Sequence, residues 1–135
     1  MEIWNYYCMD VMCKGKYPYW SERYWDDHHI KLTIMDEDLK DFKEGIVDFI
    51  SFSYYRTDCS QADQKKSREK TNFGLKNPLL DATQWGWTID PDGLRWLLNE
   101  FYNRYEKPLI IVENGIGAYD QKEEDGTIHD IERIE

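Results

Sequence analysis

Glu113 is the residue of this sequence best placed to do chemistry, because it ends an apolar run and precedes a turn. The run Pro108–Val112 reads Pro-Leu-Ile-Ile-Val, and Asn114-Gly115 follows the glutamate. A short apolar run bounded by turn residues is typical of a buried strand, and Asn-Gly is a strong turn signal. Glu113 is therefore either a catalytic carboxylate at a strand end or simply the first solvated residue of the turn.

A tyrosine ends a second predicted strand in the same manner. Side chains alternate along the stretch Val47–Tyr55, which places Ser53 and Tyr55 on one face and Tyr54 on the other. If both strand ends face one interior, the phenol of Tyr55 can approach the carboxylate of Glu113. The alternative is an ordinary, partly exposed tyrosine at a strand end.

The element that must connect these two strands is a helix. Asp90 is a candidate N-cap, Pro91 suits the first turn, and Lys107-Pro108 ends the pattern. The apolar stripe of this helix consists of Leu94, Leu97, Leu98, Phe101 and Tyr105. Strand, loop, helix and strand form a βαβ unit with a right-handed crossover, so the predicted fold class is α/β. In barrels of this class, polar residues at the carboxyl ends of strands are typical of catalytic sites.

Two further regions have weaker patterns. Residues 1–32 are rich in Tyr and Trp and suggest short helical pieces, and Asp36 is expected to cap a short helix that Gly45 ends. Residues 56–84 are predicted to form a long βα loop, which in compact domains is typically functional or disordered. The basic run within it, Gln64–Lys70, either attracts a phosphorylated substrate or is a solvated surface.

Composition limits the possible partners. The net charge of −10 and the pI of 4.7 argue against nucleic acid and against an anionic membrane. Three cysteines without a CxxC spacing and three scattered histidines predict neither a disulfide framework nor a metal site, and no cofactor is implied. No signal peptide or membrane span is apparent. We therefore expect a cytoplasmic protein with free thiols.

Several segments together resemble glycoside hydrolase family 1, and within it the bacterial 6-phospho-β-glucosidases. Val47–Tyr55 (VDFISFSYY) is similar to the family's sixth barrel strand, and Pro108–Gly117 (PLIIVENGIG) is similar to its seventh. Gln84–Leu94 (QWGWTIDPDGL) resembles the start of the helix between them. Further matches, in the same order, are Gly15-Lys16-Tyr17-Pro18, Asp125-Gly126-Thr127-Ile128 and Arg133-Ile134. The resemblance implies that residues 1–135 form one incomplete segment of a (β/α)8 TIM barrel, with about strands six and seven and their flanking helices.

The resemblance also implies an activity, the hydrolysis of O-glycosidic bonds with retention of configuration. Retention needs a nucleophilic carboxylate and an acid/base carboxyl about 5–5.5 Å apart. By the match, Glu113 is the nucleophile, and Tyr55 orients it through a hydrogen bond. Ser53, Asn114 and Trp87 are candidate substrate-binding residues. For Trp87, as for Trp85, a core position is favoured over contact with the sugar, because both precede a helix that must dock on the barrel.

The match also points to a substrate class. Ser53 stands where many β-glucosidases of the family carry Asn, and Ser-Tyr-Tyr resembles the branch that acts on β-glucosides carrying a 6-phosphate. Ala118 and Asp120 agree with that branch.

One catalytic group of the family has no counterpart in these residues. The acid/base glutamate of the family lies in an Asn-Glu-Pro motif, and this sequence contains none. Asn99-Glu100-Phe101 is the nearest substitute, but it falls within the predicted helix and is interpreted as structural. The family's eighth strand and its phosphate-binding segment are also absent, and a complete barrel needs about 250 residues.

Three hypotheses follow for the 135-residue chain. It is a segment of a 6-phospho-β-glucosidase, poorly folded and inactive alone because strand edges and apolar faces would be exposed. Alternatively, it is a stable, non-catalytic carbohydrate-binding or interaction domain. The third hypothesis is half of a split glycosidase, whose partner would be the missing N-terminal half of the barrel.

Overall fold

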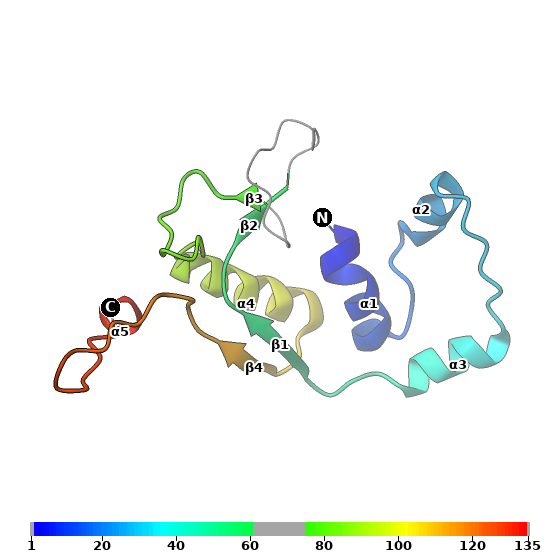
Figure 1. Cartoon of the computed structure of the whole chain (residues 1–135). Coiled ribbons are helices and arrows are strands. Elements are labelled where there is room, and N and C mark those ends of the chain that lie inside the picture. Colours follow the sequence, from blue (N-terminus) through cyan, green and yellow to red (C-terminus); the bar gives the residue numbers. More distant parts are fainter. Residues whose placement is uncertain (1, 61–74, 135) are drawn as a thin grey trace. The chain divides into compact units, whose positions relative to one another are not determined.

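The computed structural model describes residues 2–60 and 75–134, which belong to two compact units. Unit 1 is built from Met1–Ile50 and Tyr102–Pro108, and unit 2 from Ser51–Phe101 and Leu109–Glu135. Figure 1 shows the elements in chain order. The basic run within the predicted loop 56–84 lies outside the described residues.

Unit 1 contains three helices and the end of a fourth. They are α1 (Glu2–Lys14), α2 (Ser21–Asp27), α3 (Asp36–Glu44) and the last residues of α4 (Pro91–Tyr105). The short helices expected within residues 1–32 are therefore present. The helix after residue 35 ends at Gly45 as expected, but its N-cap is Met35 rather than Asp36. The reason is that the carboxylate of Asp38 reaches back and accepts the Met35 N–H at 2.8 Å, which satisfies that donor.

Aromatic rings fill the space between the helices of unit 1. Tyr17 packs edge-on against Trp25 at 4.9 Å and against Phe42 at 5.3 Å, measured between ring centroids. Tyr7 contacts Tyr17, and its hydroxyl accepts the indole N–H of Trp25 at 3.1 Å. A good part of the high aromatic content is thus used for ordinary packing.

A charged cluster joins α1 to the end of α4 within unit 1. Asp10 is only 4% exposed. It accepts hydrogen bonds from Arg104 at 2.7 and 3.0 Å and from the Tyr105 hydroxyl at 2.9 Å, and Lys14 lies 3.2 Å away. Burial acts to raise the pKa of the Asp10 carboxyl, but these hydrogen bonds together outweigh it and hold that pKa below its ordinary value.

Unit 2 contains the predicted βαβ unit. Strand β1 (Ile50–Tyr54), helix α4 and strand β4 (Leu109–Asn114) follow one another, and β1 and β4 are neighbours in one sheet. Their arrows point the same way in Figure 1, so the pair is parallel. The expected N-cap of α4 is confirmed, because the Gly93 N–H donates to the Asp90 carboxylate at 2.9 Å. Strand β1 begins three residues later than the predicted strand, which started at Val47.

The remaining elements of unit 2 are short. Strands β2 (Asp58–Cys59) and β3 (Leu75–Lys76) form an antiparallel pair, with Asp58 opposite Lys76, and α5 (Ile131–Ile134) ends the described chain. In the described part of the chain, no helix has the length and apolar character needed to cross a membrane. The three cysteines are free, as expected.

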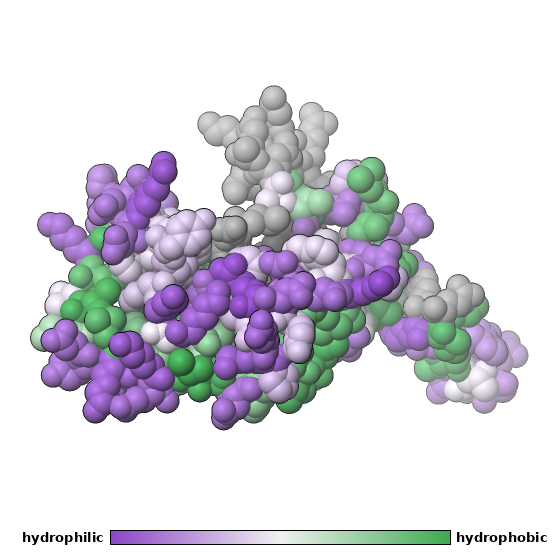
Figure 2. Space-filling view, turned by 180° about the vertical axis from the view of Figure 1, so that it is seen from behind, coloured by the Kyte–Doolittle hydropathy of each residue, from purple (hydrophilic) through white to green (hydrophobic). Residues whose placement is uncertain are grey.

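One face of the β1–β4 sheet is packed by α4, and the rest is partly open. Phe52 meets Phe101 of α4 edge-on at 5.4 Å. Ile110 and Val112 of β4 are 45% and 60% exposed, so the full cover expected for a parallel strand with two apolar faces is not found among the described residues. Figure 2 shows hydrophobic residues at the surface among hydrophilic ones.

We predict that Asp10→Asn weakens the attachment of α1. Arg104 and Lys14 would lose a buried counter-charge, at a cost of about 2 kcal/mol, so amide hydrogen exchange in α1 should become about 30-fold faster. Because the pKa of Asp10 is lowered, its contribution is present at neutral pH and is lost as the pH falls below the ordinary value of 3.8. Asp27→Asn, in an exposed pair with Arg23, is the control and should change exchange less than threefold; equal effects of both changes would contradict this assignment.

Candidate active site

Two hydroxyl groups from β1 and its end converge on the carboxylate of Glu113. The Tyr55 phenol donates to Oε2 of Glu113 at 2.9 Å, and the Ser53 hydroxyl donates to the same oxygen at 3.0 Å. Both donors are therefore directed to Oε2, and neither occupies Oε1. A carboxylate held in this way has one oxygen fixed by hydrogen bonds and the other directed elsewhere, which suits a group that must present one oxygen to a substrate.

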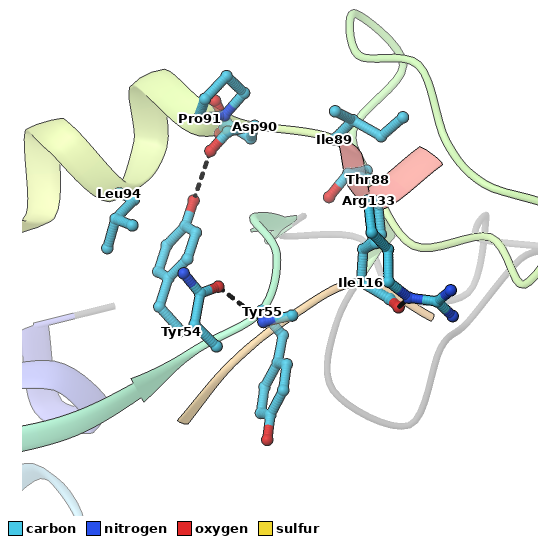
Figure 3. A pocket seen from close by; sticks show the side chains of 11 residues that line it. Tyr54, Tyr55, Thr88, Ile89, Asp90, Pro91, Leu94, Ile116 and Arg133 are labelled. Atoms are coloured by element: carbon cyan, nitrogen blue, oxygen red, sulfur yellow. Dashed lines mark hydrogen bonds between the residues drawn. The ribbon is translucent and has the colours of Figure 1, made fainter. Parts of the chain in front are cut away.

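The strand geometry explains why these three residues meet. Ser53 and Tyr55 share a face because side chains alternate along β1, and Glu113 lies near the end of the neighbouring strand β4. Tyr54 points to the opposite side. Figure 3 shows the neighbouring phenols of Tyr54 and Tyr55 directed away from each other.

The opposite-facing Tyr54 fixes the start of α4 against the end of β1. Its hydroxyl donates to the Asp90 carbonyl at 3.0 Å and lies 2.9 Å from the Thr57 hydroxyl. Gly93 completes this contact, since a Cβ atom there would collide with the Tyr54 hydroxyl and the Asp90 carboxylate. The two adjacent tyrosines therefore have different roles: Tyr54 contacts the start of α4, and Tyr55 contacts the carboxylate of Glu113.

The contact with Glu113 changes the pKa of the Tyr55 phenol. The hydrogen bond to Glu113 raises the pKa of Tyr55, and burial and the negative charge of the carboxylate add to the effect. The cause is that a phenolate would lose its hydrogen bond and stand beside another anion. The phenol therefore remains a hydrogen-bond donor at neutral pH.

An open cavity of about 600 Å³ lies next to Tyr54 and Tyr55. Its lining includes Tyr54, Tyr55, Asp90, Asn114 and Arg133, several of which are drawn in Figure 3. Glu113 itself does not line it, and of the lining residues Tyr55 is the one whose side chain contacts the carboxylate. The Asn114 side chain also accepts the N–H of Gly115 at 2.7 Å, which stabilises the turn after β4.

The two tryptophans named from the sequence lie next to Tyr55. The Trp87 ring meets the Tyr55 ring at 5.5 Å, and Trp85 meets Trp87 at 6.2 Å and Tyr119 at 5.9 Å. Trp87 is half-buried, whereas Trp85 is 51% exposed. Asn99-Glu100-Phe101 lies within α4, as the sequence indicated.

The structure adds residues that the sequence analysis missed. Arg133 donates to the carbonyl of Ile116 at 3.2 Å and to the carboxylates of Asp120 at 2.7 Å and Asp130 at 2.6 Å, which brackets the segment after Glu113. Arg56 lies over the ring of Trp87. The Asp-x-x-Arg spacing of Asp130 and Arg133 at the start of a helix was a sequence signal for the role of Arg133. No sequence pattern indicated the position of Arg56 over Trp87.

Within residues 2–60 and 75–134, no cluster of His, Cys, Asp and Glu could hold a metal ion.

Fold and site define a class of protein, an α/β segment that presents a hydrogen-bonded carboxylate at the carboxyl end of a parallel strand, as barrel enzymes do. The sequence model described as Glycosyl hydrolase family 1 matches residues 1–135. The chain belongs to that family.

Curated relatives and solved structures agree with this assignment. The chain is 52% identical to "Phospho-cellobiase" of Klebsiella oxytoca and 49% identical to "6-phospho-beta-glucosidase" of Dickeya chrysanthemi, in each case over 93% of this chain and 27% of the relative. The solved family 1 β-glucosidase of Thermotoga maritima is 26% identical, with a TM-score of 0.69 over 95% of this chain and 28% of that chain. The chain thus spans about a quarter of the length of the proteins it matches.

We predict that the phenol of Tyr55 titrates above its ordinary range because of Glu113. A suitable host is a chimera in which this chain replaces the matched segment of the Klebsiella oxytoca phospho-cellobiase. Tyrosine labelled at Cζ with ¹³C, assigned with Tyr55→Phe, should show Tyr55 titrating at lower pH after Glu113→Gln, since the negative charge is removed. Tyr102, which is 58% exposed, is the internal control. An unchanged Tyr55 titration would contradict the observed contact.

Proposed function

We propose that this chain is the nucleophile-bearing segment of a retaining 6-phospho-β-glucosidase. The observation that carries the proposal is the Glu113 carboxylate, held through Oε2 by Tyr55 and Ser53 at the end of β4. The names of the relatives, a phospho-cellobiase and a 6-phospho-β-glucosidase, support the substrate class, a β-glucoside that carries a phosphate. On this proposal the protein acts in the cytoplasm.

In the proposed reaction, Glu113 attacks the anomeric carbon through Oε1. The hydrogen bonds of Tyr55 and Ser53 hold the carboxylate in the orientation for attack. The leaving-group oxygen is protonated by a second carboxyl, and a water activated by that same group then hydrolyses the glycosyl-enzyme. The second carboxyl must come from outside these 135 residues, because the sequence contains no Asn-Glu-Pro motif.

We further propose that β1 and β4 are the sixth and seventh strands of a (β/α)8 barrel. Residues 1–135 then form one segment of that barrel, with residues 56–84 as a long βα loop. The coverage of 27% of the relatives supports this placement, as do the exposed faces of Ile110 and Val112, which further elements would bury. The rest of the barrel is the implied partner, whether on the same polypeptide or on another.

Substrate contacts are assigned to residues near the carboxylate. Asn114 follows Glu113 directly at the end of β4 and is a candidate for contact with the sugar. Ser53 already donates to Glu113, so its main role is to hold the nucleophile, and any contact with substrate would be secondary.

We predict that the purified 135-residue chain has no detectable turnover of an aryl 6-phospho-β-glucoside. It supplies only one of the two carboxyl groups that the reaction needs. The assay is release of the aryl alcohol at high protein concentration, with the Klebsiella oxytoca enzyme as positive control. Turnover by the folded, homogeneous chain would contradict the need for a second carboxyl from elsewhere, and tight binding of the sugar phosphate without turnover would favour a binding domain.

In the chimera, we predict hydrolysis with retention and its loss in Glu113→Gln. Removal of the nucleophile should lower kcat by at least about 10⁴-fold, whereas Glu100→Gln within α4 should retain most of the activity. Nuclear magnetic resonance of the first-formed sugar gives the stereochemical outcome. A folded chimera in which Glu113→Gln stays active, or which inverts configuration, would refute the proposed role.

A further inference from the structure

We propose that Thr88 is a positioning residue, whose buried hydroxyl keeps the Tyr55 phenol on Glu113. This role rests on the proposed function of Glu113 as nucleophile. Thr88 acts through the backbone that carries Tyr55, and in this it differs from Ser53, whose hydroxyl donates to the carboxylate directly.

Tyr55 needs support from outside its strand because of its place in the chain. It lies one residue beyond β1 and is 40% exposed. Its hydroxyl nevertheless reaches Glu113 at 2.9 Å. A hydrogen bond from a ring in such a position keeps its geometry only if the backbone that carries the ring is held by neighbouring groups.

Two hydrogen bonds hold this backbone, one before Tyr55 and one after it. Before it, the Tyr54 hydroxyl donates to the Asp90 carbonyl at 3.0 Å, as Figure 3 shows. After it, the Thr88 hydroxyl donates to the Thr57 carbonyl at 2.6 Å. The hydroxyls of Thr57 and Tyr54 lie 2.9 Å apart, so the two points of attachment are also connected to each other.

The segment that supplies Thr88 is itself held by backbone contacts. Thr88 pairs with Ala82 in an antiparallel bridge, and the Ile89 N–H donates to the Asp81 carbonyl at 2.9 Å. The next residue is Asp90, which caps α4. Thr88 is therefore a fixed point from which one hydrogen bond can hold the chain beyond β1.

Burial makes the hydroxyl of Thr88 hard to replace. The residue is only 2% exposed, and a backbone carbonyl that loses its donor where water has little access loses free energy. Without this hydroxyl, we expect the Thr57 carbonyl to turn toward another donor. The chain just before it, which includes Tyr55, would turn with it and draw the phenol away from Glu113.

The order of contacts thus runs from Thr88 through the backbone of Thr57 and Tyr55 to Glu113. If Thr88 acts in this way, loss of its hydroxyl matters only while the Tyr55 hydroxyl is present. The alternative route runs through Trp87, the preceding residue, whose displacement would change substrate binding whether or not the Tyr55 hydroxyl is present. A double-mutant cycle separates the two routes.

The experiment uses the active chimera with Thr88→Val, which keeps the shape of the side chain, and Thr88→Ser, which keeps the hydroxyl. Thr88→Val should lower kcat about tenfold with KM nearly unchanged, because a small misplacement of a group that aligns the nucleophile slows the chemical step. Thr88→Ser should keep kcat within about threefold of the parent, because the Thr57 carbonyl retains its donor. In the Tyr55→Phe background, Thr88→Val should add less than about a twofold loss.

The matched control is Thr127→Val. The Thr127 hydroxyl donates to the Asp125 carboxylate at 2.7 Å, but it does so in an exposed turn. The same substitution therefore removes a hydrogen bond of similar length, and both kinetic constants should stay near those of the parent.

A second variant keeps the test decisive if Thr88→Val does not fold. Tyr54→Phe removes the attachment on the other side of Tyr55. It should also lower kcat with KM nearly unchanged, and this effect should be lost in the Tyr55→Phe background. A Tyr54→Phe chimera with the kcat of the parent would contradict the need for these attachments.

A spectroscopic readout makes the test independent of turnover. The ¹³C titration of Tyr55 should move to lower pH in Thr88→Val, because the phenol leaves the carboxylate whose hydrogen bond raises its pKa. It should not move in Thr88→Ser or in Thr127→Val. In the Glu113→Gln background, Thr88→Val should no longer shift this titration.

The role of Thr88 is overturned if Thr88→Val leaves kcat unchanged, whether or not KM rises, or if its full effect persists in the Tyr55→Phe background. An unmoved Tyr55 titration also overturns it. Glu113→Gln in the same chimera separates this role from the proposed function: if that variant is inactive and the coupling between Thr88 and Tyr55 is absent, only the role of Thr88 is wrong. If that variant is active, the proposed nucleophile is wrong.

Discussion

The pair of hydrogen bonds on one oxygen of Glu113 is the interaction on which the functional interpretation of this structure depends. Tyr55 and Ser53 both donate to Oε2, and they can do so only because alternate residues of one strand face the end of its parallel neighbour. A shift of one residue in register would turn both hydroxyls to the opposite face. The chemistry assigned to Glu113 is therefore tied to the pairing of β1 with β4.

The surrounding elements maintain this pairing. Tyr54 and Gly93 hold the start of α4 at the end of β1, and Phe52 and Phe101 pack the helix onto the strand. Beyond β4, Arg133 stabilises the following segment by donating hydrogen bonds to the Ile116 carbonyl and to the Asp120 carboxylate. Local contacts on both sides of the carboxylate thus come from the same unit of the chain, which explains how the geometry of the site is specified by a segment about a quarter as long as the relatives.

Much of this arrangement could be predicted from sequence because it follows local rules. The cap at Asp90, the stripe of α4 and the apolar strand before Glu113 each depend on residues close in the chain, and the structure agrees with them. Alternation alone placed Tyr55 and Ser53 on one face of the predicted strand, and the structure places both hydroxyls on Glu113.

Other features could not be predicted, because they depend on competition or on contacts distant in sequence. At α3, both Asp36 and Asp38 are close enough in sequence to cap the start of the helix. The structure shows that the Asp38 carboxylate accepts the Met35 N–H. The buried pairing of Asp10 with Arg104 joins residues at opposite ends of the chain. The position of Arg56 over the Trp87 ring and the close approach of Gly117 to that ring likewise have no local signal.

The proposed role of Glu113 requires that this carboxylate forms the covalent bond to the sugar. This bond can be trapped by treating the active chimera with a 2-deoxy-2-fluoro β-glucoside 6-phosphate that bears a good leaving group, and the adduct can then be located by peptide mass spectrometry. We expect a single adduct on Glu113, in the peptide that contains Val112-Glu113-Asn114. An adduct on another carboxylate, or time-dependent inactivation that persists in Glu113→Gln, would contradict it.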